Sequence, residues 1–207
     1  MTTATAATTR EPSPRIRRRQ KRTRQAILQA AIDKFAVHGI AGVSIEEIID
    51  AADVSRGTFY KHFKSKEDVL TQILVPMMSW YGKKLEAIDA EDPQQILDQI
   101  FDVYIQIWRE APGAFSLASQ ESRKYFHLLE ESHLPVMTNM RRLFEIIEKH
   151  GILRAGTADY AVALLARSAV VVLRVFDQDP DWEQLFRATM RGFLLDTNAE
   201  LTIGDSR

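Results

Sequence analysis

A stretch of seven residues within the first third of the chain carries an unusual density of hydrogen-bond donors. The donors come from Arg56, Thr58, Tyr60, Lys61 and His62. A guanidinium can bind guanine O6 and N7 together, and hydroxyl, ammonium and imidazole groups bind phosphate oxygens in protein–DNA complexes. The chemistry that this segment offers is therefore recognition of a nucleic acid.

The helix that would hold these donors is short and amphipathic. Ser55 is a good N-cap, and Phe59 and Phe63, four residues apart, point to a core. At about 100° per residue, Lys61 faces away from both rings, so the polar groups gather on the opposite side. An ordinary solvated helix face is the alternative interpretation of this polarity.

A second short helix precedes it. Ser44 followed by Glu47 forms a capping box, which predicts that this helix begins at Ser44. Its apolar residues recur at helical spacing and form one buried stripe, which consists of Ile45, Ile48, Ile49 and Ala52. Asp53 and Val54 interrupt the period before Ser55. Two short helices joined by a tight turn are typical of a helix-turn-helix, whose second helix enters the DNA major groove.

Two further helices flank this pair. An apolar stripe at helical spacing predicts a helix over Lys21–Val37, which His38-Gly39 ends. After the helix-turn-helix, Ser65 with Asp68 three residues later caps a fourth helix. The first three helices together form a three-helix unit.

The segments Gly57–Phe63 and Lys64–Glu67 read Gly-Thr-Phe-Tyr-Lys-His-Phe and Lys-Ser-Lys-Glu. With these motifs, Thr23–Leu70 resembles the DNA-binding domain of the tetracycline-repressor (TetR) family. In that family the helix-turn-helix ends in Gly-Thr-aromatic-Tyr-x-His-Phe and then Lys-x-Lys-Glu. One departure is Asp53, which stands where the family usually has Gly at the turn. Aspartate tolerates a left-handed conformation better than most residues, so we expect the turn to survive.

The resemblance implies a role for each matching residue. Arg56 is the candidate for a base-edge contact, Gly57 lets the backbone approach the duplex, and Thr58 meets a thymine methyl group or a phosphate. The other candidates for DNA binding are Ser44, Ser55, Tyr60, Lys61, His62 and Lys66. Two alternatives stay open: Tyr60 packs on the fourth helix, or His62 binds a backbone carbonyl.

Charge is divided unevenly along the chain. Residues 1–66 contain 13 Lys or Arg and 6 Asp or Glu, a balance of +7, and the remainder contains 14 against 22, a balance of -8. The two balances sum to the overall net charge of -1. The first part of the chain is therefore the part that suits a polyanion.

Much of the positive excess lies in Arg15–Arg24, and its densest part is Arg17, Arg18 and Arg19. We expect a disordered basic arm over residues 1–20 that enters the minor groove or follows phosphates. The helix-turn-helix domain would then cover residues 21–66. The alternative is that the basic run is the charged start of the first helix.

Other functions find little support in the sequence. The chain has no cysteine and no signal-peptide core, which fits a cytoplasmic protein. Tyr160–Phe176 is the most apolar stretch, but two arginines interrupt it, so we expect a buried helix and no membrane segment. Neither a nucleophile elbow nor a phosphate loop appears, so we expect no enzyme, and no cofactor or metal. Asp179 before Pro180 is interpreted as a helix N-cap rather than part of a calcium loop.

The rest of the chain, residues 67–207, has the pattern of successive helices that Pro and Gly separate. The predicted fold class is therefore all-α. Pro76 is expected to bend or end the fourth helix. Later helices are expected over Pro93–Arg109, Ala114–Glu131, Leu134–His150, Thr157–Phe176 and Pro180–Asn198.

The last two of these helices are dense in Ala, Val and Leu, which permits close helix approach. In the TetR family two such helices pair with their copies in a four-helix interface, so the resemblance implies a homodimer. A dimer would present two reading helices about 34–36 Å apart to a near-palindromic stretch of double-stranded DNA. The alternative is that the two helices only close the core of the monomer.

The middle of the chain is rich in aromatic residues and methionine. Members of the TetR family usually hold a small-molecule pocket in this region, and apolar walls are typical of such sites. The candidate lining residues are Phe101, Tyr104, Trp108, Phe115, Arg123, Phe126, Met137, Met140 and Phe144, with Arg123 or Tyr125 as the polar anchor. Plain hydrophobic core is the alternative for the aromatic stripe.

The sequence therefore indicates a DNA-binding transcriptional regulator. We expect a repressor that a small apolar or amphipathic ligand, bound in the C-terminal domain, releases from its operator. The alternative is an effector-independent DNA-binding accessory or structural protein with the same head domain.

Overall fold

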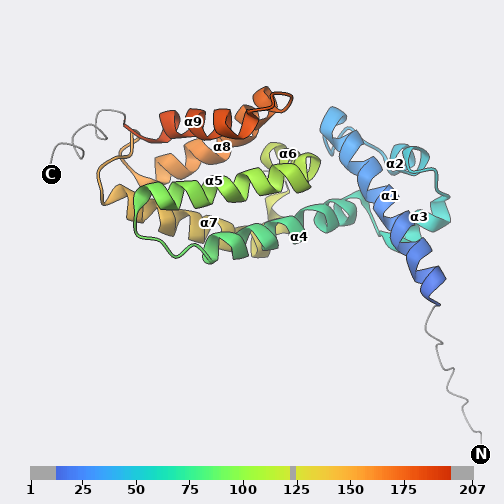
Figure 1. The fold of residues 1–207 in the computed structure, drawn as a ribbon. Helices are drawn as coiled ribbons and strands as arrows, with labels where there is room; N and C mark the ends of the chain where they lie inside the picture. The colour runs from blue at the N-terminus through green and yellow to red at the C-terminus, as the bar shows by residue number, and fades with distance from the viewer. Residues whose placement is uncertain (1–12, 122–124, 197–207) are drawn as a thin grey trace, which may run out of the picture.

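The computed structural model describes residues 13–121 and 125–196 (Figure 1). These residues form nine helices, which are α1 (Pro14–His38), α2 (Ile45–Ala51), α3 (Arg56–His62), α4 (Lys66–Glu86), α5 (Pro93–Glu110), α6 (Pro112–Glu121), α7 (Phe126–Glu148), α8 (Ala158–Phe176) and α9 (Trp182–Leu194). Within them the β pairing is one isolated bridge between Leu153 and Leu195. The predicted all-α fold class is confirmed. In the described ranges no helix has both the length and the apolar character that a bilayer span requires.

Helix α1 begins earlier than its apolar stripe predicted. Ser13 is the N-cap and accepts a hydrogen bond from the backbone N–H of Ile16 at 3.5 Å, and Pro14 takes the first helical position. Proline is favoured there because its missing N–H is not needed, and Arg and Gln are good helix formers. The expected disordered arm over residues 1–20 is therefore wrong for the basic run, which forms exposed turns of α1. Residues 1–12 lie outside the described residues.

Helices α1, α2 and α3 pack around a small core in which Phe35, Ile48 and Phe59 are fully buried. The predicted capping box at the start of α2 is confirmed: the Ser44 N–H donates to Glu47 Oε2 at 2.8 Å, and the Glu47 N–H donates to Ser44 Oγ at 3.2 Å. These bonds satisfy backbone groups that a helix end would otherwise leave without partners.

The other predicted helix ends of this unit are also confirmed. Gly39 follows α1 with φ of 66°, and Ser55 Oγ accepts from the Thr58 N–H at the start of α3. Asp53 has φ of 50° in the turn between α2 and α3, which is the left-handed conformation expected for a residue in place of glycine. The sequence thus determines the turn geometry of the helix-turn-helix residue by residue.

Helix α4 connects the three-helix unit to the C-terminal bundle (Figure 1) and passes through Pro76 without ending. Pro76 is exposed and removes only one backbone hydrogen bond from the helix. Ser65 caps the helix, because its Oγ accepts from the Asp68 N–H at 3.2 Å. The same helix therefore contributes its first turn to the head and its later turns to the bundle.

The predicted break between two helices near His133 is wrong, because helix α7 passes through this residue. It runs from Phe126 to Glu148 with Pro135 inside it, whereas α6 ends at Glu121. Pro135 lies against Gly82 of α4, where a Cβ added to Gly82 would be 3.2 Å from the Pro135 Cβ. Close packing of α4 on α7 outweighs the backbone hydrogen bond that Pro135 cannot donate, because tertiary contacts override local propensity.

The start of α9 also differs from the prediction. The helix begins at Trp182, and Asp179 is not its N-cap. Asp179 Oδ1 instead accepts from the Asp181 N–H at 2.8 Å, which closes a turn ahead of the helix. Short acidic side chains favour both arrangements, so the sequence alone did not separate them.

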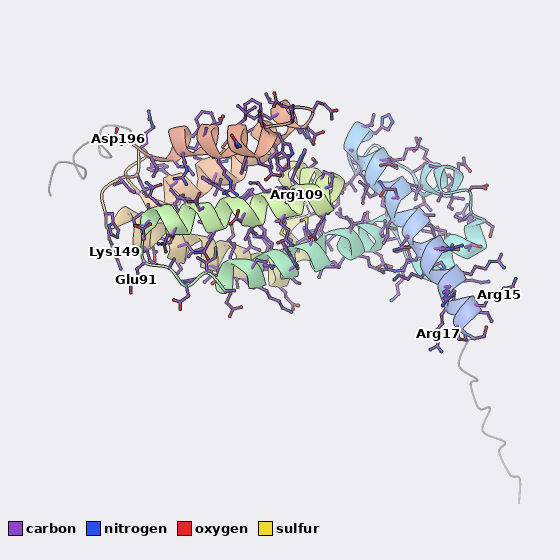
Figure 2. All side chains as sticks on the ribbon, in the orientation of Figure 1. Arg15, Arg17, Glu91, Arg109, Lys149 and Asp196 are labelled. Atoms are coloured by element: carbon purple, nitrogen blue, oxygen red, sulfur yellow. The ribbon has the colours of Figure 1, made fainter. Side chains whose placement is uncertain are left out.

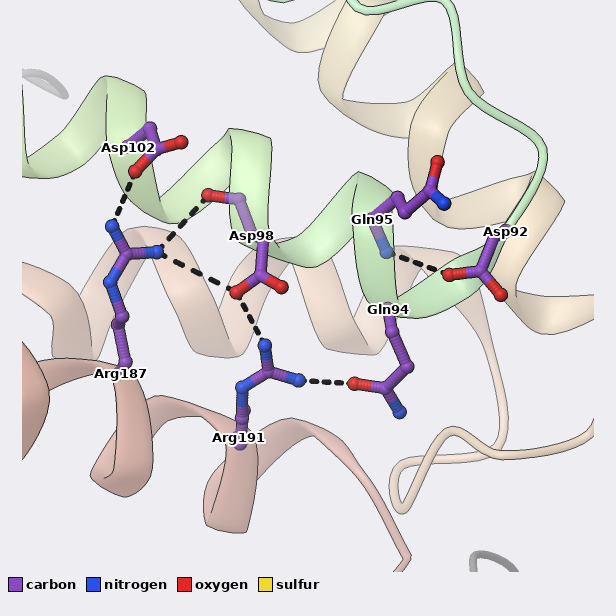
Figure 3. A network of polar contacts seen from close by, with 7 residues as sticks. All are labelled: Asp92, Gln94, Gln95, Asp98, Asp102, Arg187 and Arg191. Atoms are coloured by element: carbon purple, nitrogen blue, oxygen red, sulfur yellow. Dashed lines mark hydrogen bonds and ion pairs between the residues drawn. The ribbon is translucent and has the colours of Figure 1, made fainter.

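A network of polar contacts joins α9 to α5 (Figure 3). Arg187 donates to the backbone carbonyl of Asp98 at 3.3 Å and forms an ion pair with Asp102. Arg191 forms an ion pair with Asp98 and donates to Gln94. These contacts fix the rotation of α9 about its own axis and so decide which of its faces remains open.

Candidate nucleic-acid interface and central pocket

Helix α3 turns most of its predicted donors outward. Arg56, Tyr60 and Lys61 are exposed, whereas Thr58 and His62 are half-buried. The buried side of the helix is formed by aromatic side chains that pack into the head core. The outward face is therefore a convex strip of donors on a rigid support, a shape that fits a groove of double-stranded DNA.

Arg56 is held loosely at the start of this face. Its Nη1 lies 3.0 Å from Glu46 Oε1, and its guanidinium lies 5.8 Å from the centroid of the Tyr60 ring. The side chains of Arg56 and Glu46 are 68% and 59% exposed. Exposed ion pairs are worth little, about 0.2–1 kcal/mol, so this pair holds Arg56 without preventing it from binding another group.

The alternative of a backbone contact for His62 finds no hydrogen bond to support it, and Tyr60 is partly open to solvent. Tyr60 is 45% exposed, and the edge of its ring packs against Phe59 of its own helix. His62 lies beside Phe63, and within the described ranges no hydrogen bond joins its imidazole to a backbone carbonyl. Both side chains thus keep polar atoms available at the surface.

Gly57 and the α3 N-cap lie at the front of the helix. A Cβ added to Gly57 would have no heavy atom within 4 Å, so the space in front of it is open to another molecule. Ser55 Oγ accepts from the Thr58 N–H at 3.1 Å and lies 2.8 Å from Thr58 Oγ1. Ser55 therefore positions the reading helix, and its hydroxyl is already engaged there.

The helical basic run extends the α3 face. Figure 2 shows Arg15 and Arg17 at the end of α1 that lies away from the C-terminal bundle. A surface groove between α1 and α3 is lined by Ile16, Arg17, Arg19, Gln20, Lys21, Thr23, Arg24, Thr58, Lys61 and His62. Arg18 lines a separate hollow with Arg15 and Arg22. Since α1 is helical, the basic residues are divided between two sides, and a stretched-arm interpretation misses this division.

Lys66 does not belong to the open face. Its Nζ donates to the carbonyls of Ile40 and Val43 at 2.9 and 3.0 Å, and it lies 3.5 Å from the carbonyl of Ala41. An ammonium has three donors, so these contacts use its capacity inside the protein. We therefore reassign Lys66 from phosphate binding to holding the loop between α1 and α2.

Ser44 is also engaged within the protein. Its hydroxyl donates to Glu47 Oε2 at 2.7 Å in addition to the two backbone contacts of the capping box. The hydrogen bonds from Ser44 lower the pKa of the Glu47 carboxyl below its usual range. The carboxylate already occupies the start of α2, so a phosphate must share that position with it.

A pocket of about 410 Å³ lies between α4, α5, α6, α7 and α8, and we call it the central pocket. Its lining residues are Met78, Tyr81, Tyr104, Phe115, Ala118, Ser119, His133, Val136, Met137, Met140, Val162, Ala163, Ala166, Arg167 and Val170. This volume falls within the roughly 300–1,000 Å³ that is usual for small-molecule sites. The mainly apolar wall with few polar groups is also usual for them.

Four of the nine residues proposed from the sequence line this pocket, which are Tyr104, Phe115, Met137 and Met140. Three others face elsewhere: Phe101 packs against the ring of Phe186, Trp108 Nε1 donates to Asp177 at 2.8 Å, and Phe144 is fully buried in the core. An aromatic stripe in the sequence does not indicate which of its members faces a void. Arg123 lies outside the described residues, as does the side chain of Phe126.

The sequence did not identify the contributions of α4 and α8 to the pocket. Tyr81 and Tyr104 form an edge-to-face pair with ring centroids 5.6 Å apart. Burial raises the pKa of Tyr104 to about 12 and that of Tyr81 well above its usual value, so both phenols stay protonated at neutral pH. Partial burial lowers the pKa of His133 below its usual value, which favours the neutral imidazole.

The outer sides of α8 and α9 remain apolar and exposed. Tyr160, Val171, Val175 and Phe193 are 69%, 60%, 71% and 42% exposed. The inner sides of the same helices are buried, with Leu173 and Met190 fully enclosed. These helices therefore close the core of the chain and, in addition, present exposed apolar side chains on their outer face, beside Arg167 and Arg174.

Residues 27–73 match the family described as bacterial regulatory proteins, tetR family. The chain is 32% identical over 138 residues to the HTH-type transcriptional repressor KstR2 of Mycolicibacterium smegmatis, an alignment that covers 66% of this chain and 65% of that protein. It is also 32% identical over 94 residues to the probable acrEF/envCD operon repressor of Escherichia coli, covering 44% and 43% of the two chains. The chain thus spans less than two thirds of either relative.

Solved structures support the fold over a longer range. The ketosteroid transcriptional regulator KstR2 of Mycobacterium tuberculosis superposes with a TM-score of 0.66 at 18% identity, covering 84% of this chain and 95% of that one. A mutant of HlyIIR superposes with a TM-score of 0.63 at 21% identity, covering 86% and 99%. At these identities the similarity concerns the arrangement of the helices alone. The relatives matched by sequence are transcriptional regulators, in agreement with the expectation of a non-enzymatic protein.

Proposed function

We propose that this chain, which belongs to the TetR family of bacterial regulatory proteins, represses transcription by binding double-stranded DNA through α3 and the basic end of α1. The observation that carries the proposal is the groove between α1 and α3, where Arg17, Arg19 and Lys21 line the same surface as Thr58 and Lys61. Clustered cations and hydroxyls around an exposed reading helix are the features that phosphate and base-edge contacts require.

Each side chain of this surface has a distinct task. Arg56 leaves Glu46 and binds a base edge, with guanine as the best match for its guanidinium. Tyr60, Lys61 and His62 bind phosphates on either side and fix the position of α3. Gly57 permits close approach to the duplex because nothing blocks the space before it.

The active form is a homodimer assembled through α8 and α9. Its support is the exposed apolar outer face of these helices, where Val171 and Val175 are 60% and 71% exposed. One seven-residue helix reads only a few base pairs, whereas two heads about 34–36 Å apart read a near-palindrome on one side of the duplex.

A small molecule in the central pocket weakens operator binding. Helix α6 supports this step because it lines the pocket with Phe115 and Ala118 and also contacts α1. At that contact a Cβ added to Gly113 would lie 2.5 Å from Ile32 Cγ2, so α6 cannot approach α1 further without moving it. The ligand acts only through its difference in affinity for the DNA-binding and released states.

The test of the DNA-binding proposal begins with selection of bound fragments from a genomic library, followed by titrations at several salt concentrations. Replacing Arg56 with Ala should weaken binding to the selected site by roughly 1–3 kcal/mol and relax the preference for one base pair. Arg141→Ala, an exposed arginine on α7, is the matched control and should leave affinity unchanged. Equal affinity and equal base preference for the Arg56→Ala variant would remove Arg56 from the reading face.

A further inference from the structure

The wall of the central pocket carries an asymmetric charge. Among its 15 described lining residues none is acidic, and Arg167 alone of them carries a permanent charge. In the single chain Arg167 is exposed, one helical turn from Val171 of the proposed dimer face, and within the described residues its guanidinium makes no ion pair or hydrogen bond. An unneutralised cation at the mouth of an apolar pocket attracts an anionic group and repels a cationic one.

The closed end of the pocket offers a neutral donor. Tyr81 and Tyr104 are only 5% and 4% exposed, and their rings form the edge-to-face pair. Two phenols have two O–H donors, and a bond between them can use only one. Among the described residues no further acceptor receives the second O–H, so it is available to an oxygen of a bound molecule.

The rest of the wall is apolar and adaptable. Phe115 and the side chains of Met78, Met137 and Met140 provide it. Methionine is flexible and fills irregular gaps, so this section imposes a size limit more than a defined shape. His133 adds no charge near neutral pH because burial lowers its pKa.

We propose that the central pocket selects organic acids: an anionic group at Arg167, an apolar body along the methionines, and a carbonyl or hydroxyl oxygen at the tyrosine pair. The inference rests on the proposed effector role of the same pocket and adds the chemical class of the effector. Organic cations are disfavoured because none of the described lining residues is a carboxylate that could receive them.

Two fluorescent probes of nearly the same shape test this selection. 8-Anilinonaphthalene-1-sulfonate carries one anionic group, and N-phenyl-1-naphthylamine is the same ring system without it. The full-length protein should bind the sulfonate probe more tightly than the neutral one. Arg167→Met should weaken only the sulfonate probe, by roughly fivefold to tenfold, the range of a charge-assisted contact at a partly exposed site. Arg167→Lys should restore most of the loss.

Two further variants separate the inference from the proposed function. Arg141→Met changes an exposed arginine outside the pocket and should alter neither affinity. Ala166→Phe narrows the pocket mouth and should weaken both probes. If Ala166→Phe weakens both probes but Arg167→Met leaves their affinity ratio unchanged, the pocket binds ligands and selection for acids is wrong. If the affinity of neither probe changes in Ala166→Phe, the pocket is not a binding site. The selection for acids and the proposed effector role of the pocket then both fail, whereas the DNA-binding proposal is unaffected.

Discussion

Individual charged side chains of the head differ in what they already bind, and this decides what they can offer to DNA. Arg24 donates to Gln72 of α4 and lies 5.7 Å from the centroid of the Phe63 ring, so it joins helices. Arg56 is held by an exposed carboxylate and the exposed Tyr60 ring, and Lys61 is exposed on the outward face of α3. Residue type and spacing identified all of these as cations, but only the three-dimensional contacts separate structural cations from available ones.

The buried state of His133 predicts a pH dependence of stability. Its folded pKa is depressed, so between that value and the unfolded pKa, near 6.5, the unfolded chain binds more protons than the folded chain. The free energy of unfolding should therefore fall as the pH drops below about 6.5. In His133→Gln the decrease in the free energy of unfolding that His133 causes should disappear. Urea unfolding between pH 5 and pH 8, roughly the range of histidine titration, measures it.

The same substitution at His150, which is exposed on the last turn after α7, is the control. If the free energy of unfolding depends on pH in the same way in the wild-type chain and in His133→Gln, burial of this imidazole does not affect stability.

At the scale of helices, the ends were predictable wherever a single side chain satisfies the backbone. Ser44, Ser55, Ser65 and Gly39 fix helix ends through contacts within three or four residues, so the sequence contains all the information. The placement of Pro135 inside α7 was not predictable, because it depends on Gly82 of a helix some fifty residues away.

The candidate sites also divide into one that neighbouring residues determine and one that depends on distant helices. The reading face of α3 is local, since it follows from the spacing of buried and exposed residues within seven positions. The central pocket draws side chains from five helices, so Tyr81 and Arg167 could not be assigned to it before the helices were assembled. Helical periodicity tells which residues face inward, but it does not tell which of them border a void.

The contact between α6 and α1 predicts the effect of one methyl group. In Gly113→Ala the new Cβ would lie 2.5 Å from Ile32 Cγ2, a branched and stiff side chain, so the helices must separate. The expected loss of unfolding free energy is about 1–3 kcal/mol, measured by denaturant unfolding without DNA. Adding Ile32→Ala should give a smaller loss than the sum of the two single variants.

Gly57→Ala provides the comparison, because no heavy atom lies within 4 Å of its added Cβ. Alanine in a helix is favoured over glycine, so this variant should be neutral or up to about 1 kcal/mol more stable. If Gly57→Ala and Gly113→Ala lose equal free energies of unfolding, the close contact between Gly113 and Ile32 does not determine stability.

For the whole molecule, the proposed dimer predicts that a charge on the outer face of α8 prevents association. Val171 is 60% exposed, so Val171→Glu should fold normally but be monomeric, because a dimer would bury a carboxylate in place of an apolar side chain. Sedimentation velocity over a range of protein concentrations measures the association. The same change at Val37, which is 75% exposed on α1, should leave the dimer intact. A monomeric wild-type chain, or a dimeric Val171→Glu variant, would contradict assembly through α8.

Lys66 lies at the junction between the head and α4, where its ammonium holds three carbonyls of the loop that follows α1. Selection to keep the shape of that loop and selection to keep a phosphate contact would both preserve a lysine at this position. An invariant lysine in an alignment of homologues would therefore not, by itself, mark a point where protein meets nucleic acid. A residue of a DNA-recognition motif can therefore be kept because it holds the structure around the recognition helix, and not because it contacts DNA.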